Sequence, residues 1–228
     1  MTTLIIGANG KIGRLLVEKC VANGMAVRAM VRHSGQAQQF EEMGAEAVMG
    51  NLEGSMDEAF RGCERVVFSA GSGPSTSPHK TLLVDLWGSI RAIEHAERQG
   101  IRQFVMVSSL KADDPLRGPE KIRHYLVARN CADDRLMRSS LDYTLLRPGR
   151  LLDEPAQGAF DNQVDWADDT NRTSVISRED VADAIVELLR HPLPSSRVID
   201  MVSGQQPLPE FLKQYARSVG NPERPLRQ

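Results

Sequence analysis

Three glycines spaced three residues apart could form a phosphate-binding turn. Gly7, Gly10 and Gly13 stand in the segment LIIGANGKIGRLL, between an apolar run and a segment of helical period. Gly7 would permit a tight turn, Gly10 would let the backbone approach a ligand, and Gly13 would let a helix pack against a strand. The N-terminus of that helix offers free N–H groups and the positive end of the helix dipole, which suits a pyrophosphate.

The spacing of these glycines is GxxGxxG, one residue longer than the dinucleotide fingerprint, and alone it is a weak signal. The alternative is a strand-to-helix turn that only needs flexible residues. The preceding strand and the following helix favour dinucleotide binding, so Asn9, Lys11 and Ile12 are also predicted to contact the cofactor. Arg14 could reach a phosphate or simply occupy the first helical turn.

The residue after the second predicted strand indicates which dinucleotide is bound. The segment MVRHS at 30–34 places Arg32 there, and no acidic residue occurs between Glu18 and Glu41. An Asp or Glu at this place binds the adenosine ribose of NAD, whereas an Arg can accept the 2′-phosphate of NADP through charge-assisted hydrogen bonds. The sequence therefore predicts NADP, with NAD less favoured; the alternative is an ordinary solvated Arg.

Short apolar runs alternate with segments of helical period along the chain. We expect strands at 3–6, 26–31, 46–49, 65–69, 103–107, 142–147 and 197–202. We expect helices near 11–23, 35–43, 54–61, 78–99, 119–139 and 178–190. Such alternation is typical of βαβ units. It predicts an α/β fold, a doubly wound parallel Rossmann sheet with helices on both faces.

Residues 1–228 are predicted to form a single domain. Ser77 before Pro78, and Ser177 with Asp180, are expected to cap helices. The least regular stretch, 149–176, is expected to lie over the carboxyl edge of the sheet. The tail at 204–228 is expected to hold one short helix near 210–218.

Composition limits the class of protein. With 228 residues, 41% of them hydrophobic, the chain can bury a sizeable core. A net charge of -2 gives no reason to expect nucleic acid or an anionic membrane. No apolar run approaches the ~20 residues of a membrane span, and the N-terminus begins with a strand-like LIIG, so we expect a cytoplasmic protein. The scattered Cys and His residues predict reduced thiols and no metal site.

The motifs together resemble a known family. They are GANGKIG at the first turn, VRH after the second strand, GNLEG after the third, SAG at 69–71, VSS at 107–109, HYLVAR at 124–129 and LDYTLLRPGRLLDEP at 141–155. The chain is similar to atypical short-chain dehydrogenases/reductases of the compact NAD(P)-binding group, which also resembles NmrA-like regulators and flavin/biliverdin-IXβ reductases. The resemblance covers residues 1 to about 203. It implies a single Rossmann domain with a small C-terminal part on the substrate side.

The resemblance also implies where the cofactor lies. Asn51 and Leu52 would border the adenine, Ser69, Ala70 and Gly71 the ribose and pyrophosphate, and Pro148 and Gly149 the nicotinamide. Ser108, Tyr125 and Arg129 would contact the cofactor from the catalytic side. The implied partner is a small-molecule substrate.

The chemistry of this family rests on a Tyr and a Lys four residues apart, together with a Ser at the end of the fifth strand. Here the pair is Tyr125 and Arg129, and Ser109, or less favourably Ser108, would polarise a substrate carbonyl. A spacing of four puts both side chains on one helix face, so the cation can act on the phenol. Arg in place of Lys departs from the pattern, because a planar guanidinium is not interchangeable with an ammonium. The alternative is a helix Tyr packed on the sheet beside a solvated Arg.

The sequence therefore predicts an oxidoreductase that binds NADP(H) and transfers a hydride to or from a small carbonyl, quinone or flavin-like substrate. Three alternatives are a dinucleotide-sensing regulator without turnover, a nucleotide-sugar epimerase or dehydratase, and a protein that chiefly binds a partner. The short region after Gly149 counts against the epimerase, and Arg129 favours the regulator.

Several other polar or aromatic residues have simpler explanations. The pairs Asp113–Asp114 and Asp133–Asp134 are expected on solvated faces, because adjacent helical residues point apart. Trp87 fits a buried helix face. The acidic run at 165–169, with Asp165, Trp166, Asp168 and Asp169, could line a substrate entrance or form a surface hairpin.

Overall fold

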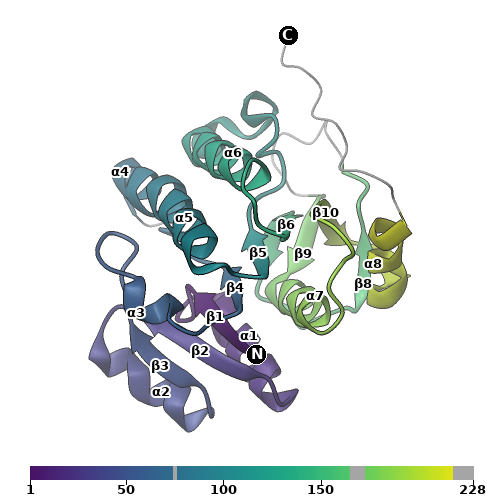
Figure 1. Ribbon diagram of the computed structural model, residues 1–228. Helices are drawn as coiled ribbons and strands as arrows, with labels where there is room; N and C mark the ends of the chain where they lie inside the picture. Colours follow the sequence, from purple (N-terminus) through teal and green to yellow (C-terminus); the bar gives the residue numbers. More distant parts are fainter. Residues whose placement is uncertain (74–75, 165–172, 218–228) are drawn as a thin grey trace.

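The computed structural model describes residues 1–73, 76–164 and 173–217 (Figure 1). In this part of the chain the main sheet has the strand order β11-β8-β10-β6-β5-β4-β1-β2-β3. The strands from β3 to β10 are parallel to one another. They are β1 (Thr2–Ile6), β2 (Ala26–Val31), β3 (Glu46–Met49), β4 (Arg65–Phe68), β5 (Gln103–Val107), β6 (Tyr143–Pro148) and β10 (Arg197–Ser203).

All the strands predicted from the sequence are present, to within a residue at each end. Their runs of Val, Ile, Leu and Met suit a parallel sheet that is buried on both faces. The strand order reverses between β1 and β4, so a crevice for a ligand is expected where the chain leaves the carboxyl ends of these two strands. The predicted doubly wound Rossmann fold is confirmed.

The helices follow the predicted segments, three of which are divided into shorter elements. They are α1 (Lys11–Ala22), α2 (Ala37–Glu42), α3 (Asp57–Phe60), α4 (Pro78–Lys80), α5 (Ser89–Gln99), α6 (Arg123–Met137), α7 (Arg178–Arg190) and α8 (Leu208–Arg217). The expected helix at 78–99 is interrupted by a π-helical segment, η2 (Thr81–Gly88). Short 3-10 turns, η1 (Ser34–Gln36) and η4 (Glu120–Ile122), precede α2 and α6.

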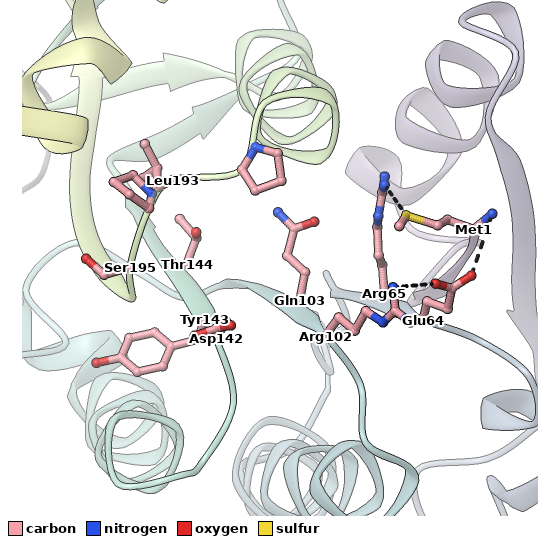
Figure 2. Close-up of a pocket in the computed structure, with 12 residues that line it drawn as sticks. Met1, Glu64, Arg65, Arg102, Gln103, Asp142, Tyr143, Thr144, Leu193 and Ser195 are labelled. Carbon is pink, nitrogen blue, oxygen red and sulfur yellow. Dashed lines mark hydrogen bonds and ion pairs between the residues drawn. The ribbon is translucent and has the colours of Figure 1, made fainter.

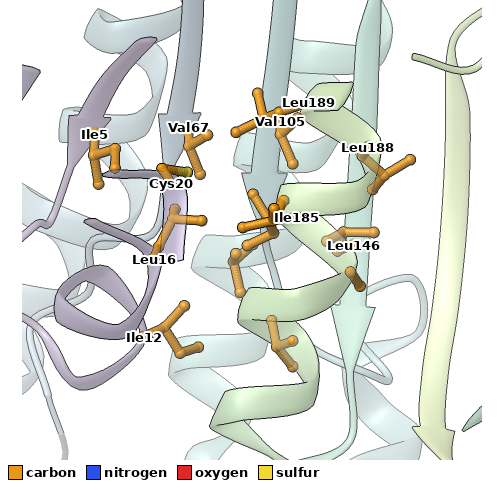
Figure 3. Close-up of a cluster of buried hydrophobic side chains, with 14 of the residues drawn as sticks. Ile5, Ile12, Leu16, Cys20, Val67, Val105, Leu146, Ile185, Leu188 and Leu189 are labelled. Carbon is orange, nitrogen blue, oxygen red and sulfur yellow. The ribbon is translucent and has the colours of Figure 1, made fainter. Parts of the chain in front are cut away.

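Two hydrophobic clusters cover the two faces of the sheet. Ile5 and Val67 belong to the cluster that packs against α1 and α7, which Figure 3 shows. Leu4 and Val66, each one residue earlier, belong to the cluster with side chains of α3, α5 and α6. This alternation follows from the two-residue period of a strand. Helices packed on both faces therefore fix the position of the sheet, and with it the edge where the carboxyl ends of the strands lie.

The segment expected to be irregular contains three short strands that the sequence did not reveal. β7 (Arg150–Leu152) pairs with β9 (Val175–Ser177) in a separate parallel pair, and β8 (Ala159–Asp161) joins the main sheet antiparallel to β10. β11 (Gln206–Pro207) pairs with β8. Runs of two or three residues are too short to show a period. The expected tail helix is α8; residues 165–172 and 218–228, including the acidic run, lie outside the described part.

Three expectations about individual side chains were wrong. Trp87 is 52% exposed, because it lies in η2, where the wider π turn shifts the helical period on which the expectation rested. Asp133 is fully buried and pairs with Arg147 of β6, whereas Asp134 does point outward and pairs with Arg138. Ser77 is the N-cap residue before Pro78, as predicted, but its side chain makes no capping hydrogen bond. Ser177 does accept a hydrogen bond from the N–H of Asp180.

Candidate functional site

The glycine turn lies at the crevice between β1 and β4. Gly7 has a φ of +90°, and a Cβ there would stand 2.6 Å from the backbone nitrogen of Ala70. A Cβ at Gly13 would collide with the Gly7 carbonyl oxygen and with Ala8. Gly10 has an ordinary φ of -74°, and its Cβ would meet only the Gly7 carbonyl oxygen, at 3.2 Å. The turn itself therefore requires Gly7 and Gly13, whereas at Gly10 there is space that a ligand could occupy.

A groove of about 250 Å³ runs from this turn over the ends of β2 and β4. It brings together most of the residues predicted to bind the cofactor: Gly7, Asn9, Gly10, Arg32, Asn51, Leu52, Ser69, Ala70 and Gly71. Met30, Gln36, Glu53 and Val84 also line it and were missed by the sequence analysis. These residues come from five separate segments, and only the glycine turn has a local motif.

At one end of the groove, the described contacts of Arg32 involve its backbone and not its guanidinium. Gln36 accepts hydrogen bonds from the backbone N–H of Arg32 at 3.1 Å and of His33 at 3.3 Å. The exposed Arg32 guanidinium has no hydrogen bond or ion pair with any residue in the described part of the chain. Arg14, by contrast, donates to Asn9 Oδ1 at 2.6 Å, so it orients the Asn9 side chain.

A larger cavity of about 610 Å³ continues from the groove, and residues 69–71 form a wall common to both. We call it the first cavity. It is lined by Ile12, Asp85, Ser108, Tyr125 and Arg129, among others. The groove and the first cavity together make one elongated path along the carboxyl edge of the sheet, which suits an elongated ligand such as a dinucleotide.

Tyr125 and Arg129 face each other as the spacing of four residues predicts. Arg129 Nε donates to the Tyr125 hydroxyl at 3.2 Å, and the guanidinium carbon lies 5.4 Å from the centre of the phenol ring. Arg129 is only 4% exposed. The solvated Arg of the alternative reading is therefore excluded by the structure.

Asp85 of η2 is the partner of Arg129 that the sequence analysis missed. Arg129 Nη2 stands 3.2 Å from Asp85 Oδ1 and donates to the Ala70 carbonyl oxygen at 2.7 Å. Burial alone would lower the pKa of Arg129, but the neighbouring Tyr125 and Asp85 outweigh it, so the pKa is raised. A single Asp in the apolar segment TLLVDLWG was a signal of a buried ion pair, because an unpaired carboxylate is costly to bury.

A second cavity of about 430 Å³ adjoins the first, and Ser108, Tyr125 and Leu151 are among the residues that line both. Ser109 lines only the second cavity, and its hydroxyl donates to the Leu110 carbonyl oxygen at 3.2 Å. Pro148 and Gly149, expected beside the nicotinamide, line this second cavity too. Tyr125 therefore stands between two spaces.

Another buried ion pair joins α6 to β6. Arg147 Nε donates to Asp133 Oδ2 at 3.0 Å, and burial raises the pKa of Asp133. Burial also raises the pKa of the nearby Asp200 to about 6. None of these three residues lines either cavity, so they lie outside the space that a ligand could occupy.

A further cavity lies at the opposite edge of the sheet (Figure 2). It measures about 190 Å³ and contains none of the predicted site residues. Arg65 Nη1 donates to the Leu189 carbonyl oxygen and Gln103 Nε2 donates to that of Leu188, both at 2.8 Å. These contacts tie β4 and β5 to the end of α7, which indicates a structural role.

The profile of the NAD(P)H-binding family matches residues 7–192, which include the turn, the groove and both sides of Tyr125. The chain belongs to the NAD(P)H-binding family. The resemblance to atypical short-chain dehydrogenases/reductases is thereby confirmed.

Relatives of this family member share nearly its whole length. It is 44% identical over 217 residues to a protein named "Uncharacterized sugar epimerase YhfK" of Bacillus subtilis, covering 93% of this chain and 99% of that one. A solved "Putative NAD-dependent epimerase/dehydratase from Bacillus halodurans" has a TM-score of 0.87 and 41% identity, covering 94% of this chain and 99% of its own. The oxidoreductase ylbE from Lactococcus lactis has a TM-score of 0.83 and 25% identity, covering 96% and 98%.

The described residues contain neither a membrane-spanning helix nor a metal-binding cluster. They hold no helix that is both long and apolar enough to cross a membrane. In the same ranges, no group of three or more His, Cys, Asp or Glu residues could bind a metal ion. Cys20, Cys63 and Cys131 are free thiols.

Proposed function

We propose that this family member binds NADP(H) and transfers a hydride between it and a small carbonyl, quinone or flavin-like substrate. The observation that carries the proposal is the position of Tyr125. Its side chain lies between the first cavity, which continues the dinucleotide groove, and the second cavity, which is open to another molecule. A proton donor at this boundary can serve a reaction between a cofactor on one side and a substrate on the other.

The residues present fit a dinucleotide. The Gly7 turn and the α1 N-terminus provide the backbone cradle in which no Cβ intrudes, and Gly10 leaves room beside the free N–H groups of the helix. Asn51 and Leu52 would hold the adenine end, and the 69–71 segment would hold the middle. Tyr125 and Arg129 would hold the nicotinamide end in the first cavity.

Arg32 supports NADP over NAD. It follows β2, lines the groove, and has no partner for its guanidinium in the described residues. An unengaged Arg at this place can bind the 2′-phosphate through charge-assisted hydrogen bonds, whereas NAD offers only a hydroxyl there.

NADPH, when bound, supplies a hydride to the carbonyl carbon. Tyr125 would give its hydroxyl proton to the carbonyl oxygen, so that the alcohol forms without a free alkoxide. Ser109, or Ser108, would donate a hydrogen bond to that oxygen and orient it. Arg129 holds the Tyr125 hydroxyl at 3.2 Å and is itself fixed by Asp85 and the Ala70 carbonyl.

Arg129 performs only part of what a Lys would do at this place. Its charge and its hydrogen bond to the phenol are retained, so the Tyr125 side chain is oriented. A guanidinium does not release its proton at neutral pH, so the proton that Tyr125 gives up has to return from solvent or from the substrate side.

The second candidate is an epimerase or dehydratase. The names of the Bacillus subtilis relative and of the Bacillus halodurans structure favour it, and each of these chains is covered almost completely. The short C-terminal region counts less against this function than the sequence suggested, because a chain of the same extent carries that name. Such an enzyme would not consume NADPH, which separates it from the proposed oxidoreductase.

The test is NADPH consumption in the presence of a panel of aldehydes, quinones and flavins. Binding of NADPH and of NADH is measured on the same preparation by fluorescence titration. Consumption with at least one acceptor supports the proposal. Tight NADPH binding without consumption across the panel would favour the sensor or the epimerase, and absence of binding to either cofactor would rule out all three functions.

A further inference from the structure

The charged residues that line the second cavity in the described part of the chain are all positive. Lys121, Arg150 and Arg178 line it, and none of the described residues that line it is acidic. They come from three separate elements, η4, β7 and α7. The other walls include Leu110, Ile122 and Leu151, which are apolar. The cavity therefore combines apolar surface with converging positive charge.

Arg178 is held in place by a carboxylate outside the cavity lining. Its Nη1 atom stands 2.6 Å from Asp153 Oδ1 and donates to the Leu151 carbonyl oxygen at 3.2 Å. Asp153 also accepts a hydrogen bond from Lys11 Nζ. One exposed carboxylate thus serves two cations, so it leaves net positive charge beside the cavity.

Lys121 places one of these positive charges close to Tyr125. It lines both cavities, as Tyr125 does, and it precedes Tyr125 by four residues. Within residues 1–73, 76–164 and 173–217, no carboxylate lies within ion-pair distance of its ammonium. An ammonium that borders a substrate space and has no ion-pair partner among these residues can bind an anion there.

We propose that the substrate carries a carboxylate or a phosphate on an apolar body, and that Lys121 with Arg178 binds this anion in the second cavity. The proposal rests on the proposed function, because it takes the second cavity to be the substrate site. With a neutral carbonyl compound, Lys121 would have no anion to bind, and Arg178 would keep only Asp153 and the Leu151 carbonyl oxygen. The anion would therefore determine which carbonyl compounds are reduced and how they are oriented toward Tyr125.

The first experiment measures binding without turnover. Benzoate, phenyl phosphate and benzamide are titrated by calorimetry into the protein saturated with NADP⁺, so that the dinucleotide groove is filled. One of the two anions is expected to bind about ten- to a hundred-fold more tightly than benzamide, because a charge-assisted contact is added. The tighter of the two distinguishes a carboxylate from a phosphate. Anions that bind no more tightly than benzamide, or not at all, would overturn the proposal.

Three variants locate the anion. Lys121→Met is expected to remove most of the preference, and Lys121→Arg to retain it. Lys213→Met removes an exposed Lys of α8 that lines neither cavity, so it is the matched control and should leave the preference unchanged. A preference that survives in Lys121→Met would place the anion elsewhere and refute the assignment.

A second experiment separates this proposal from the proposed function. NADPH consumption is compared for 4-carboxybenzaldehyde and its neutral amide. Reduction of both with equal kcat/KM supports the oxidoreductase and overturns the anion site. Reduction of neither aldehyde and of no acceptor in the panel, with benzoate binding still lost in Lys121→Met, overturns the oxidoreductase and supports the anion site. A higher kcat/KM for the carboxylate, lowered toward that of the amide in Lys121→Met, supports both.

Discussion

The dinucleotide groove and the cavities around Tyr125 adjoin one another, yet they are built differently. The groove depends on backbone: a turn where Gly7 and Gly13 admit no side chain, and the N-terminus of α1. The cavities depend on charged side chains that distant segments bring together, such as Asp85 of η2 with Arg129 of α6. A backbone cradle suits a cofactor of constant shape, whereas side chains can change with the substrate.

Arg32 and Arg129 show this difference within one residue type. Arg32 is exposed, and its guanidinium has no partner among the described residues, so a ligand can engage it at little cost. Arg129 is buried, with Asp85, Tyr125 and the Ala70 carbonyl around it, so it is already positioned before any ligand arrives. A mutation of Arg32 should therefore affect ligand affinity alone, and a mutation of Arg129 should also affect folding.

The largest effect is expected from Tyr125→Phe. Loss of a general acid commonly lowers the rate by ~10²–10⁴, so kcat should fall by about that factor. The dissociation constant for NADPH should change little, because Phe keeps the ring beside the nicotinamide end and the groove is formed by other residues. Both are measured by steady-state kinetics and fluorescence titration. An active protein whose kcat is unchanged in this variant would remove the mechanism and favour an acceptor that needs no proton donor.

Arg129→Met should destabilise the protein by about 3–5 kcal/mol, because Asp85 keeps a buried charge without its partner. Arg129→Lys should cost less and leave turnover equal or modestly higher, since it restores the usual pair of the family. Urea denaturation measures the free energy of unfolding. Arg138→Met, at the C-cap of the same helix, removes an exposed ion pair with Asp134, so about 0.5 kcal/mol is expected. Equal losses in the two Met variants would contradict the buried-pair account.

Gly10→Val tests whether the backbone of the glycine turn binds the dinucleotide. Gly10 has an ordinary φ, and a Cβ there would meet only the Gly7 carbonyl oxygen, so the variant should fold. The branched side chain would occupy the space beside the free N–H groups, so NADPH should bind about a hundred-fold more weakly or worse. Circular dichroism checks folding and fluorescence titration checks binding. Retained affinity would show that this glycine serves the turn alone.

Arg32→Ala should change the choice of cofactor. NADPH is expected to bind about ten- to a hundred-fold more tightly than NADH, since one charge-assisted contact is worth ~1.5–3 kcal/mol. The variant should lose most of that preference with unchanged stability. Arg61→Ala, an exposed Arg that lines no part of the groove, is the control. Equal affinities for the two cofactors in the unmodified protein would disprove the assignment to NADP.

The smallest effect is expected at Asp200 of β10, which lies beside Arg147 of β6. Burial raises the pKa of Asp200 to about 6 in the folded state, above its value in the unfolded chain. Protonated Asp200 therefore contributes stability at low pH, and this contribution is lost as the pH rises through about 6. Asp200→Asn should raise the free energy of unfolding by about 1–3 kcal/mol at pH 8 and by little at pH 4. An equal gain at both pH values would mean that the charge is not the cause.

The sequence by itself determined the parallel sheet, its helices and the glycine turn. Each of these follows from a local pattern: an apolar run for a buried strand such as β5, or a glycine where Gly7 needs a positive φ. The pair Tyr125–Arg129 was also accessible, because four residues on a helix bring two side chains together whatever surrounds them. The short strands β7, β8 and β9 were not, because three residues show no period.

Only the tertiary structure decided which charges are buried and what they meet. Asp85 and Arg129, or Asp133 and Arg147, lie far apart in the chain or on different elements, and nothing in the sequence around one member specifies the other as its partner. Lys121 and Arg178 likewise converge on one cavity only because the fold brings η4 and the start of α7 to the same edge of the sheet. A charge can be buried only where the fold supplies its partner, and that partner comes from a contact that no local pattern specifies.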